Sequence, residues 1–544
     1  MAKNSFSLET NIIDPVNRRM GFATVSVENG KISVIELTGP VKEGQSYLLP
    51  GFIDAHIHIE SSMLAPPAFA AMAVRHGTVA TVSDPHEIAN VCGIEGVRYM
   101  VDAGRKSGFK SYFGAPSCVP ATPFETAGAS LLLSDIRELF HQREVHYLAE
   151  MMNYPAVLSR DPLVMDKIEL AKEFNLPVDG HAPGLKGKEA ALYASAGITT
   201  DHECVSLEEA IDKLNCGMHI IIREGSAAKN YNALHTLISS HPEKIMFCSD
   251  DKHPDDLIKG HINELVLRSL AKGYNMMDVL QIACVNPVRH YHLDTGLLQP
   301  GDPADMILVD DLFTFKILST WISGHKVFDA NKVSLPEVSL PIINSFGISA
   351  IEQQSLQLRL EAGKANIIIA IDGAIVTGHE KHEMKNGLFE SDTERDILKI
   401  VVVNRYDKAP PAIALINGFG MKQGAIASSV AHDSHNIVAV GTNDADLAAC
   451  INEVVFHKGG IAATSGKEHL CLPLPIAGLM SSETAEVAGM KYEKISNYVR
   501  SELGSTLSAP FMTLSFMALL VIPSLKLSDK GLFDGTRFEF IALQ

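Results

Sequence analysis

Two histidines one residue apart, His56 and His58, lie in the segment GFIDAHIHIESS at residues 51–62. On a β-strand, residues i and i+2 point to the same face, so two imidazoles at this spacing can bind one metal ion. Because the chain contains 22 histidines, such a pair also arises by chance. The apolar run at 48–53 predicts a buried strand that ends where the polar residues begin. This context favours a metal site at the strand end.

The chain around this pair alternates short β-rich runs with longer helical stretches from residue 48 to 292, which is typical of a parallel α/β fold. Strands are expected at 47–53, 78–84, 110–115, 145–151, 177–180, 197–201, 218–223 and 245–249. Helices are expected between them, for example at 66–76, 93–107, 159–174 and 255–272. Eight such units in about 245 residues predict a (β/α)8 barrel, whose chemistry lies at the C-terminal ends of its strands.

Polar side chains that can bind metals or move protons follow seven of the eight expected strands. They are His56 and His58 after the first strand, Asp84, His86 and Glu87 after the second, Glu150 after the fourth, His181 after the fifth, His202 after the sixth, Arg223 and Glu224 after the seventh, and Asp250 after the eighth. The third strand, which ends near GAPS at 114–117, is the exception. Four imidazoles and two carboxylates fit two metal ions ~3.5–4 Å apart better than one tetrahedral ion.

Each of these residues also has a structural interpretation. His181 and His202 could be hydrogen-bonded core histidines, but their placement at successive strand ends favours a metal role. Asp250 could cap the following helix. Arg223 and Glu224 either recognise the substrate or form a buried structural ion pair.

Composition restricts the class of protein. At 544 residues, two to four domains are expected. A net charge of −18 argues against nucleic acid as a partner. The longest apolar run, at 511–523, is too short for the ~20 residues that a membrane span needs, so it predicts a core helix. The first residues lack the apolar core of a signal peptide and no CxxC pair occurs, so we expect a cytoplasmic protein without a membrane partner.

Three domains are expected. Residues 1–49 and 293–338 are each too small to bury a core, so they should pair into one discontinuous β-sandwich domain beside the barrel at 50–292. Residues 339–544 should form a C-terminal α/β or α+β domain, with strands at 366–371, 399–403, 412–417 and 437–441 and helices at 443–457 and 481–503.

The strand-end motifs resemble those of the amidohydrolase superfamily, and in detail its adenine deaminase branch. The segments that carry this resemblance are PGFIDAHIHIESSM (50–63), SDPHEIANVCG (83–93), GHAPGL (180–185), TTDHECVS (199–206), REGSAAKN (223–230), FCSDDKHPDDL (247–257), INGFGMKQGAIASSVAHDSHNIVAVG (416–441) and LSDKGLFDGTRFEF (527–540). Many related amidases carry a carboxylated lysine at the end of strand four. Glu150 at this position is similar to the deaminase branch.

The resemblance implies hydrolysis of adenine to hypoxanthine and ammonia by a metal-held hydroxide, in purine salvage. It assigns His56, His58 and Asp250 to one divalent ion and His181 and His202 to the other, with Glu150 bridging them and Asp250 moving the proton. Manganese(II), iron(II) and zinc(II) all suit these ligands. Asp84, His86 and Glu87 become candidates for a second proton path, for purine contacts, or for support of the ligand histidines. The expected oligomer is a homodimer.

Two other functions are compatible with these residues. One is a binuclear amidohydrolase that acts on a cyclic amide. The other is a catalytically silent metal or purine binder, which the intact set of ligands disfavours. In the C-terminal region, the polar residues 432–435 are more typical of a solvated turn, although the resemblance allows a loop that closes over the barrel mouth.

Overall fold

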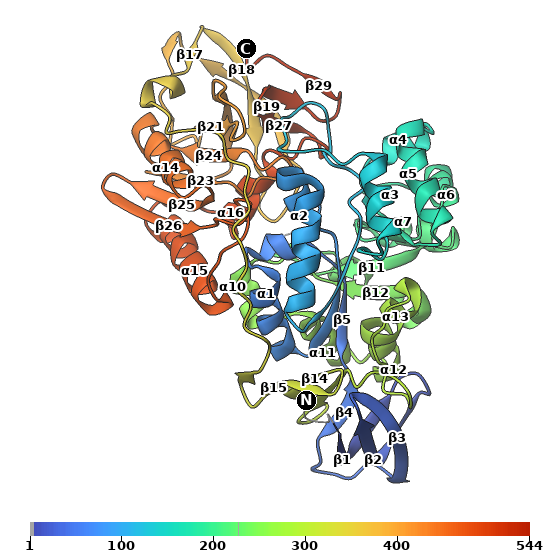
Figure 1. Ribbon diagram of the computed structural model, residues 1–544. Helices are drawn as coiled ribbons and strands as arrows, with labels where there is room; N and C mark the ends of the chain where they lie inside the picture. Colours follow the sequence, from blue (N-terminus) through green and yellow to red (C-terminus); the bar gives the residue numbers. More distant parts are fainter. Residues whose placement is uncertain (1–4, 227) are drawn as a thin grey trace.

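The computed structural model describes residues 5–226 and 228–544. Figure 1 shows the barrel in the centre of the molecule, a small sheet formed with the N-terminal strands at one end, and the C-terminal part at the other end. Among the described residues, no helix combines the length and the apolar character that crossing a bilayer requires. The run at 511–523 is helical only over α16 (Pro510–Phe516), and the residues after it form turns and bends that are buried or half-buried up to Ile522.

The central part is the predicted (β/α)8 barrel. Its strands are β5 (Phe52–Ile57), β6 (Thr78–Ser83), β7 (Lys110–Phe113), β8 (Leu148–Met151), β9 (Val178–Gly180), β10 (Thr200–Asp201), β11 (His219–Arg223) and β12 (Ile245–Cys248). The paired strands run parallel. Backbone hydrogen bonds join the remaining edges, from Ala115 to Tyr147, from Thr199 to Val178 and from Asp250 to His56. The last of these closes the barrel, because it joins the end of β12 to β5.

Helices cover the outside of the barrel, as the alternating pattern predicts. They are α1 (Pro66–Ala73), α2 (His86–Lys106), α3 (Leu133–His141), α4 (Tyr154–Leu158), α5 (Pro162–Glu173), α6 (Gly187–Ser195), α7 (Leu207–Asn215), α8 (Tyr231–Leu234), α9 (Leu237–Ser240), α10 (Pro254–Lys259), α11 (Ile262–Ala271), α12 (Met276–Leu280) and α13 (Asn286–Tyr291). Helix α2 begins at His86, seven residues before the predicted start. His86 and Glu87 therefore lie in its first turn, next to the C-terminal end of β6.

The single strand predicted at 47–53 is two strands. Residues Tyr47–Pro50 form β4 of the small sheet, and β5 of the barrel starts at Phe52. Gly51 lies between them, buried against the barrel, and a Cβ atom there would lie 2.2 Å from Val79. The chain passes from one sheet to the other at a point where a larger residue does not fit.

Replacing Gly51 by alanine should therefore lower the melting temperature by about 2–6 °C, because overpacking a rigid core costs about 1–3 kcal/mol. Gly39→Ala is the matched control, because Gly39 has no atom within 4 Å of an added Cβ. Differential scanning calorimetry measures both shifts. Equal melting temperatures for the two variants would contradict the role assigned to Gly51.

The small sheet combines strands that precede the barrel in the sequence with strands that follow it. Their order is β16-β15-β14-β13-β4-β1-β2-β3. Its strands are β1 (Phe6–Asp14), β2 (Arg19–Glu28), β3 (Lys31–Gly39), β4, β13 (Met306–Val309), β14 (Ile317–Ile322), β15 (His325–Asp329) and β16 (Lys332–Val333). The sheet curls over its own core, since the rings of Phe6 and Trp321 stack at 6.3 Å although two strands separate β1 from β14. We therefore propose that residues 1–49 and 293–338 form one discontinuous domain with this sheet. The barrel at 50–292 and the C-terminal part at 339–544 are the other two proposed domains.

The C-terminal part contains an eight-stranded sheet in the order β19-β18-β22-β21-β24-β23-β25-β26. Its strands are β18 (Gly363–Ile369), β19 (Gly378–Met384), β21 (Leu398–Val403), β22 (Ala412–Asn417), β23 (Ala425–Ser428), β24 (Ile437–Gly441), β25 (Gly460–Ser465) and β26 (Glu468–Pro473), with β17 (Arg359–Leu360) and β20 (Gly387–Leu388) paired beside it. Helices α14 (Asp444–Phe456) and α15 (Ala485–Ser501) and the sheet of β27 (Leu525–Ser528), β28 (Gly531–Asp534) and β29 (Glu539–Phe540) complete it. Apart from β18 with β22, the pairs are antiparallel, so this part is α+β.

The segment after β7 packs against the C-terminal part. The ring of Phe124 lies 5.0 Å from that of Phe533. The amide of Thr126 donates to Asp529 at 2.9 Å, and Asn436 donates to the carbonyl of Thr126 at 2.9 Å. The third strand lacks metal-binding residues at its end, and the loop that follows it holds the C-terminal part in place.

Candidate active site

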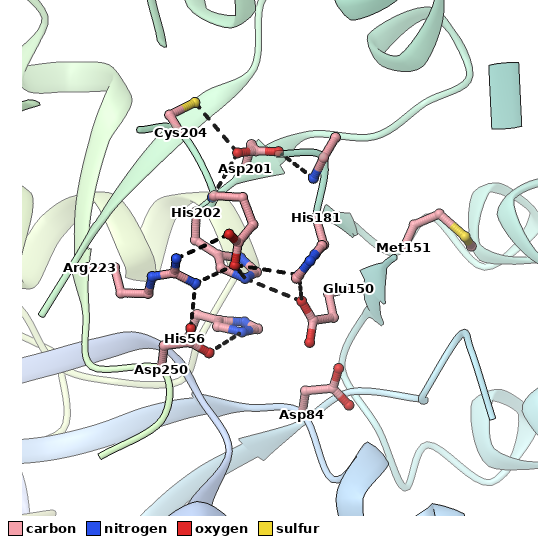
Figure 2. A network of polar contacts seen from close by, with 12 residues as sticks. His56, Asp84, Glu150, Met151, His181, Asp201, His202, Cys204, Arg223 and Asp250 are labelled. Carbon is pink, nitrogen blue, oxygen red and sulfur yellow. Dashed lines mark hydrogen bonds and ion pairs between the residues drawn. The ribbon is translucent and has the colours of Figure 1, made fainter. Parts of the chain in front are cut away.

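The six predicted metal ligands converge at the C-terminal ends of the barrel strands, around Glu150. One oxygen of Glu150, Oε1, lies 3.3 Å from Nε2 of His58. The other, Oε2, lies 2.7 Å from Nδ1 of His181 and 3.2 Å from Nε2 of His202. Figure 2 shows His181 and Glu150 pointing toward each other. The carboxylate at the end of strand four thus faces imidazoles from three other strand ends.

Asp250 completes the cluster from the end of β12. Its Oδ1 lies 3.4 Å from Nε2 of His56 and 3.1 Å from Nε2 of His58. The backbone holds Asp250 there, because its amide donates to the carbonyl of His56 at 3.0 Å. Its φ of 55° lies in the left-handed region, which aspartate tolerates better than most residues. This turn directs the carboxylate into the barrel mouth.

The cluster has the donor groups of a metal centre. His56 is fully buried, yet neither of its ring nitrogens has a hydrogen-bond partner among the described residues. The same is true of Nε2 of His181 and Nδ1 of His202. His56, His58 and Asp250 offer ligand atoms within 4.8 Å of one another, and so do His56, Glu150 and His202. Buried imidazole nitrogens without partners beside carboxylates fit metal coordination.

Arg223 forms a buried ion pair with two carboxylates, as expected from the structural interpretation of this residue. Its guanidinium donates to Oδ2 of Asp250 at 2.6 Å and to Oε2 of Glu203 at 3.1 Å. Figure 2 shows Arg223 reaching toward Asp250. Because Asp250 uses Oδ1 toward the histidines and Oδ2 toward Arg223, the orientation of its carboxylate is fixed.

Glu203 also belongs to the cluster, although the strand-end pattern does not predict it. Its Oε1 lies 3.5 Å from Nε2 of His202 and 3.7 Å from Nδ1 of His181. On a regular strand, neighbours point to opposite faces, so Glu203 should point away from His202. Strand β10 ends at Asp201, however, and both side chains lie beyond it, where this alternation does not hold.

The structure does not bring Glu224 to the cluster. Its carboxylate pairs with Arg268 at 2.9 Å. It lines a separate surface pocket together with Lys229 and Lys252. Glu224 comes directly after Arg223, the last residue of β11. Arg223 lines the cavity at the barrel mouth, whereas Glu224 does not. Substrate recognition by Glu224 has no geometric support.

The residues after β6 divide into two roles. Oδ2 of Asp84 lies 3.1 Å from Nδ1 of His86, and the Asp84 carbonyl lies 3.1 Å from Nδ1 of His58. Asp84 therefore orients these two histidines and is not among the residues that line the cavity. Nδ1 of His86 lies 3.5 Å from Oε1 of Glu150. His86 and Glu87 both line the cavity.

The C-terminal part closes over the cluster. The cavity at the barrel mouth is lined on that side by Ile375, His432, Asp433, Phe516, Leu519, Val521 and Ile522. The interpretation of residues 432–435 as a solvated turn is wrong, because all four are at most 3% exposed. His432 and His435 both donate to Glu87 of the barrel. Burial alone raises the pKa of Glu87, but the histidines beside it hold that pKa well below its usual range.

The whole chain is similar to known proteins. The profile of the Amidohydrolase family matches residues 47–327, and that of the Adenine deaminase C-terminal domain matches residues 374–539. Adenine deaminase from Salinibacter ruber is 52% identical over 540 residues, which are 99% of this chain and 98% of that protein. Adenine deaminases from a Sulfurovum species and from Methanosarcina mazei are 51% and 48% identical, each over 98% of this chain and at least 98% of their own lengths. The chain belongs to the adenine deaminase family.

Membership of the adenine deaminase family relates both halves of the site to known proteins. The amidohydrolase match contains the six predicted ligands and Glu203, and the C-terminal match contains the residues that cover them. The amidohydrolase family is metal-dependent, and the buried imidazoles and carboxylates supply groups that could hold the ions.

Proposed function

We propose that the chain hydrolyses adenine to hypoxanthine and ammonia in purine salvage, as a cytoplasmic homodimer with two divalent ions. The observation that carries this proposal is the match to adenine deaminases of about 50% identity over the full chain, including the C-terminal part that covers the cavity. Glu150 at the centre of the cluster is the local feature that agrees with it.

The geometry supports a division of the ligands between two ions. His56, His58 and Asp250 would hold one ion, and His181 and His202 the other. Glu150 would bridge them, since Oε1 faces the first group and Oε2 faces the second. When bound, such ions lower the pKa of water to ~7, so that hydroxide is available at neutral pH. Manganese(II) or iron(II) is our first expectation, and zinc(II) suits the same ligands.

Asp250 is the residue that would move the proton. Arg223 holds Oδ2, so Oδ1, which faces His56 and His58, is the oxygen that would accept the proton. In the proposed reaction a hydroxide oxygen bonds to C6 while a ring nitrogen takes a proton, which together account for one water. Asp250 then accepts the remaining hydroxyl proton, and the C6–N bond breaks as that proton passes to the amino group, which leaves as ammonia. Arg223 acts by keeping the carboxylate oriented through both transfers.

The remaining residues would hold the base and limit access of water. His86 and Glu87 line the same cavity as Asp250, on the side of β6. His86 is the candidate for protonating a ring nitrogen as C6 becomes tetrahedral, whereas Glu87 stays ionised because the two histidines beside it hold its pKa well below its usual range. The apolar residues from the C-terminal part, such as Phe516 and Ile522, would pack against the planar purine. Exclusion of water strengthens the electrostatic interactions inside the cavity.

Metal removal and reconstitution tests the proposal. The protein is stripped with a chelator and reloaded with manganese, iron or zinc, and adenine loss and ammonia release are followed together. We expect no turnover by the stripped protein and full turnover at two ions per chain with at least one metal. Hydantoin and dihydrouracil serve as control substrates. Absence of adenine turnover with every metal, or hydrolysis of a cyclic amide instead, would refute the deaminase assignment.

A further inference from the structure

One carboxylate of the barrel, Glu87, binds two histidines of the C-terminal part, but the two imidazoles differ in their remaining nitrogen. His435 donates to Glu87 from Nε2, and its Nδ1 accepts from the amide of Ala431 at 3.2 Å. Both of its ring nitrogens are therefore used inside the protein. His432 donates to Glu87 from Nδ1, and its Nε2 has no hydrogen-bond partner among the described residues.

The free nitrogen belongs to a ring that is fixed in place beside the cavity. His432 is 3% exposed and lines the cavity together with Asp250 and Glu150. The ring of Phe516 stacks on it at 5.0 Å with an interplanar angle of 19°. Glu87 therefore fixes one edge of the imidazole and Phe516 covers one face. A buried nitrogen held in this way without a partner indicates a ligand contact.

We propose that His432 is a substrate-binding residue whose Nε2–H donates a hydrogen bond to a ring nitrogen of the purine. This inference rests on the proposed function and assigns a base contact to the C-terminal part. His435 is then a positioning residue, which acts on the base only through Glu87.

The charge of the site suits a donor at this position. Burial alone lowers the pKa of His432, but the carboxylates of Glu87 and Asp251 raise it to about 9. Below that pH both ring nitrogens carry a proton, so Nε2 can donate. The pyridine-type nitrogens of a purine offer lone pairs and accept such a bond. Glu87 compensates the positive charge of the ring.

Binding of unreactive bases tests this contact. The probes are purine and its 1-deaza, 3-deaza and 7-deaza analogues, in each of which one ring nitrogen is replaced by C–H, measured by calorimetry on the metal-loaded enzyme. The wild-type enzyme should bind one of these analogues about 10- to 100-fold more weakly than purine. This is the usual effect of losing a hydrogen bond to a charged group. In His432→Asn, that analogue and purine should bind equally, because asparagine can still reach Glu87 but has no group at the Nε2 position.

Two further variants separate a base contact from a structural role. His432→Gln places an amide near the Nε2 position and should restore part of the discrimination. His435→Asn disturbs Glu87 without removing the proposed donor, so it should weaken the discrimination but still bind purine more tightly than the analogue. Metal content and melting temperature identify any variant that fails to fold.

The inference is overturned if wild type and His432→Asn discriminate the bases equally, if wild type does not discriminate, or if purine does not bind. These outcomes differ from failure of the deaminase proposal. That failure would appear as absence of adenine turnover by wild-type enzyme, whatever the binding of the bases.

Discussion

Glu150→Gln should lose at least about 10³-fold in kcat/KM for adenine and should bind fewer than two metal ions per chain. The glutamine keeps the shape of the side chain but removes the charge that faces His58, His181 and His202. Only a carboxylate can give one anionic oxygen to each of two ions, so both metal affinity and turnover depend on it. Steady-state kinetics and metal analysis of the purified variant measure the two effects.

Glu224→Gln is the matched control for this substitution. Glu224 pairs with Arg268 and lines a different pocket, so its variant should keep two ions and nearly all activity. If Glu150→Gln retained both ions and wild-type turnover, Glu150 would not bridge a metal centre. A large loss in Glu224→Gln would instead return Glu224 to the substrate site.

Asp250→Asn should lower kcat about 10²- to 10⁴-fold, which is the usual contribution of a general acid–base group. KM should change little, because the amide has nearly the same size and the base contacts remain. Arg223 keeps its contact with Glu203, so the ion pair that supports the site is only partly lost. Kinetics at saturating adenine, with metal content measured on the same preparation, separate a proton-transfer defect from metal loss.

Asp251→Asn tests whether any negative charge at the cavity has the same effect. Asp251 also lines the cavity, but its Oδ1 accepts from the hydroxyl of Ser61 at 2.5 Å. We expect a loss in kcat of about tenfold or less. Equal losses in the two variants, or wild-type kcat in Asp250→Asn, would exclude Asp250 as the proton shuttle.

Much of the barrel half of the site could be predicted from local sequence. Alternation of apolar runs with helical stretches predicts parallel strands, and parallel strands in a closed barrel bring their C-terminal ends together. His56 and His58 share a face because of the two-residue period of a strand. The residues at the ends of the other strands then follow from topology, which is why Glu150 and Asp250 could be named before the structure.

Local patterns failed where the chain is not periodic. Glu203 follows a strand of only two residues, so alternation gave no guide to its direction. Arg223 could be either a substrate contact or an ion pair until the positions of Asp250 and Glu203 were known. The strand predicted at 47–53 was divided because Gly51 lies at a junction of two sheets, and tertiary packing against Val79 determines that junction.

The sequence by itself determined the barrel, the six candidate ligands and, through Glu150, the resemblance to one branch of a superfamily. Only the tertiary structure decided what covers them. His432 and His435 lie about 350 residues after Glu87, and their meeting depends on the packing of the C-terminal part on the loop after β7. Periodicity and spacing report contacts between neighbours in sequence, whereas such a meeting is fixed by the burial of surfaces from distant segments.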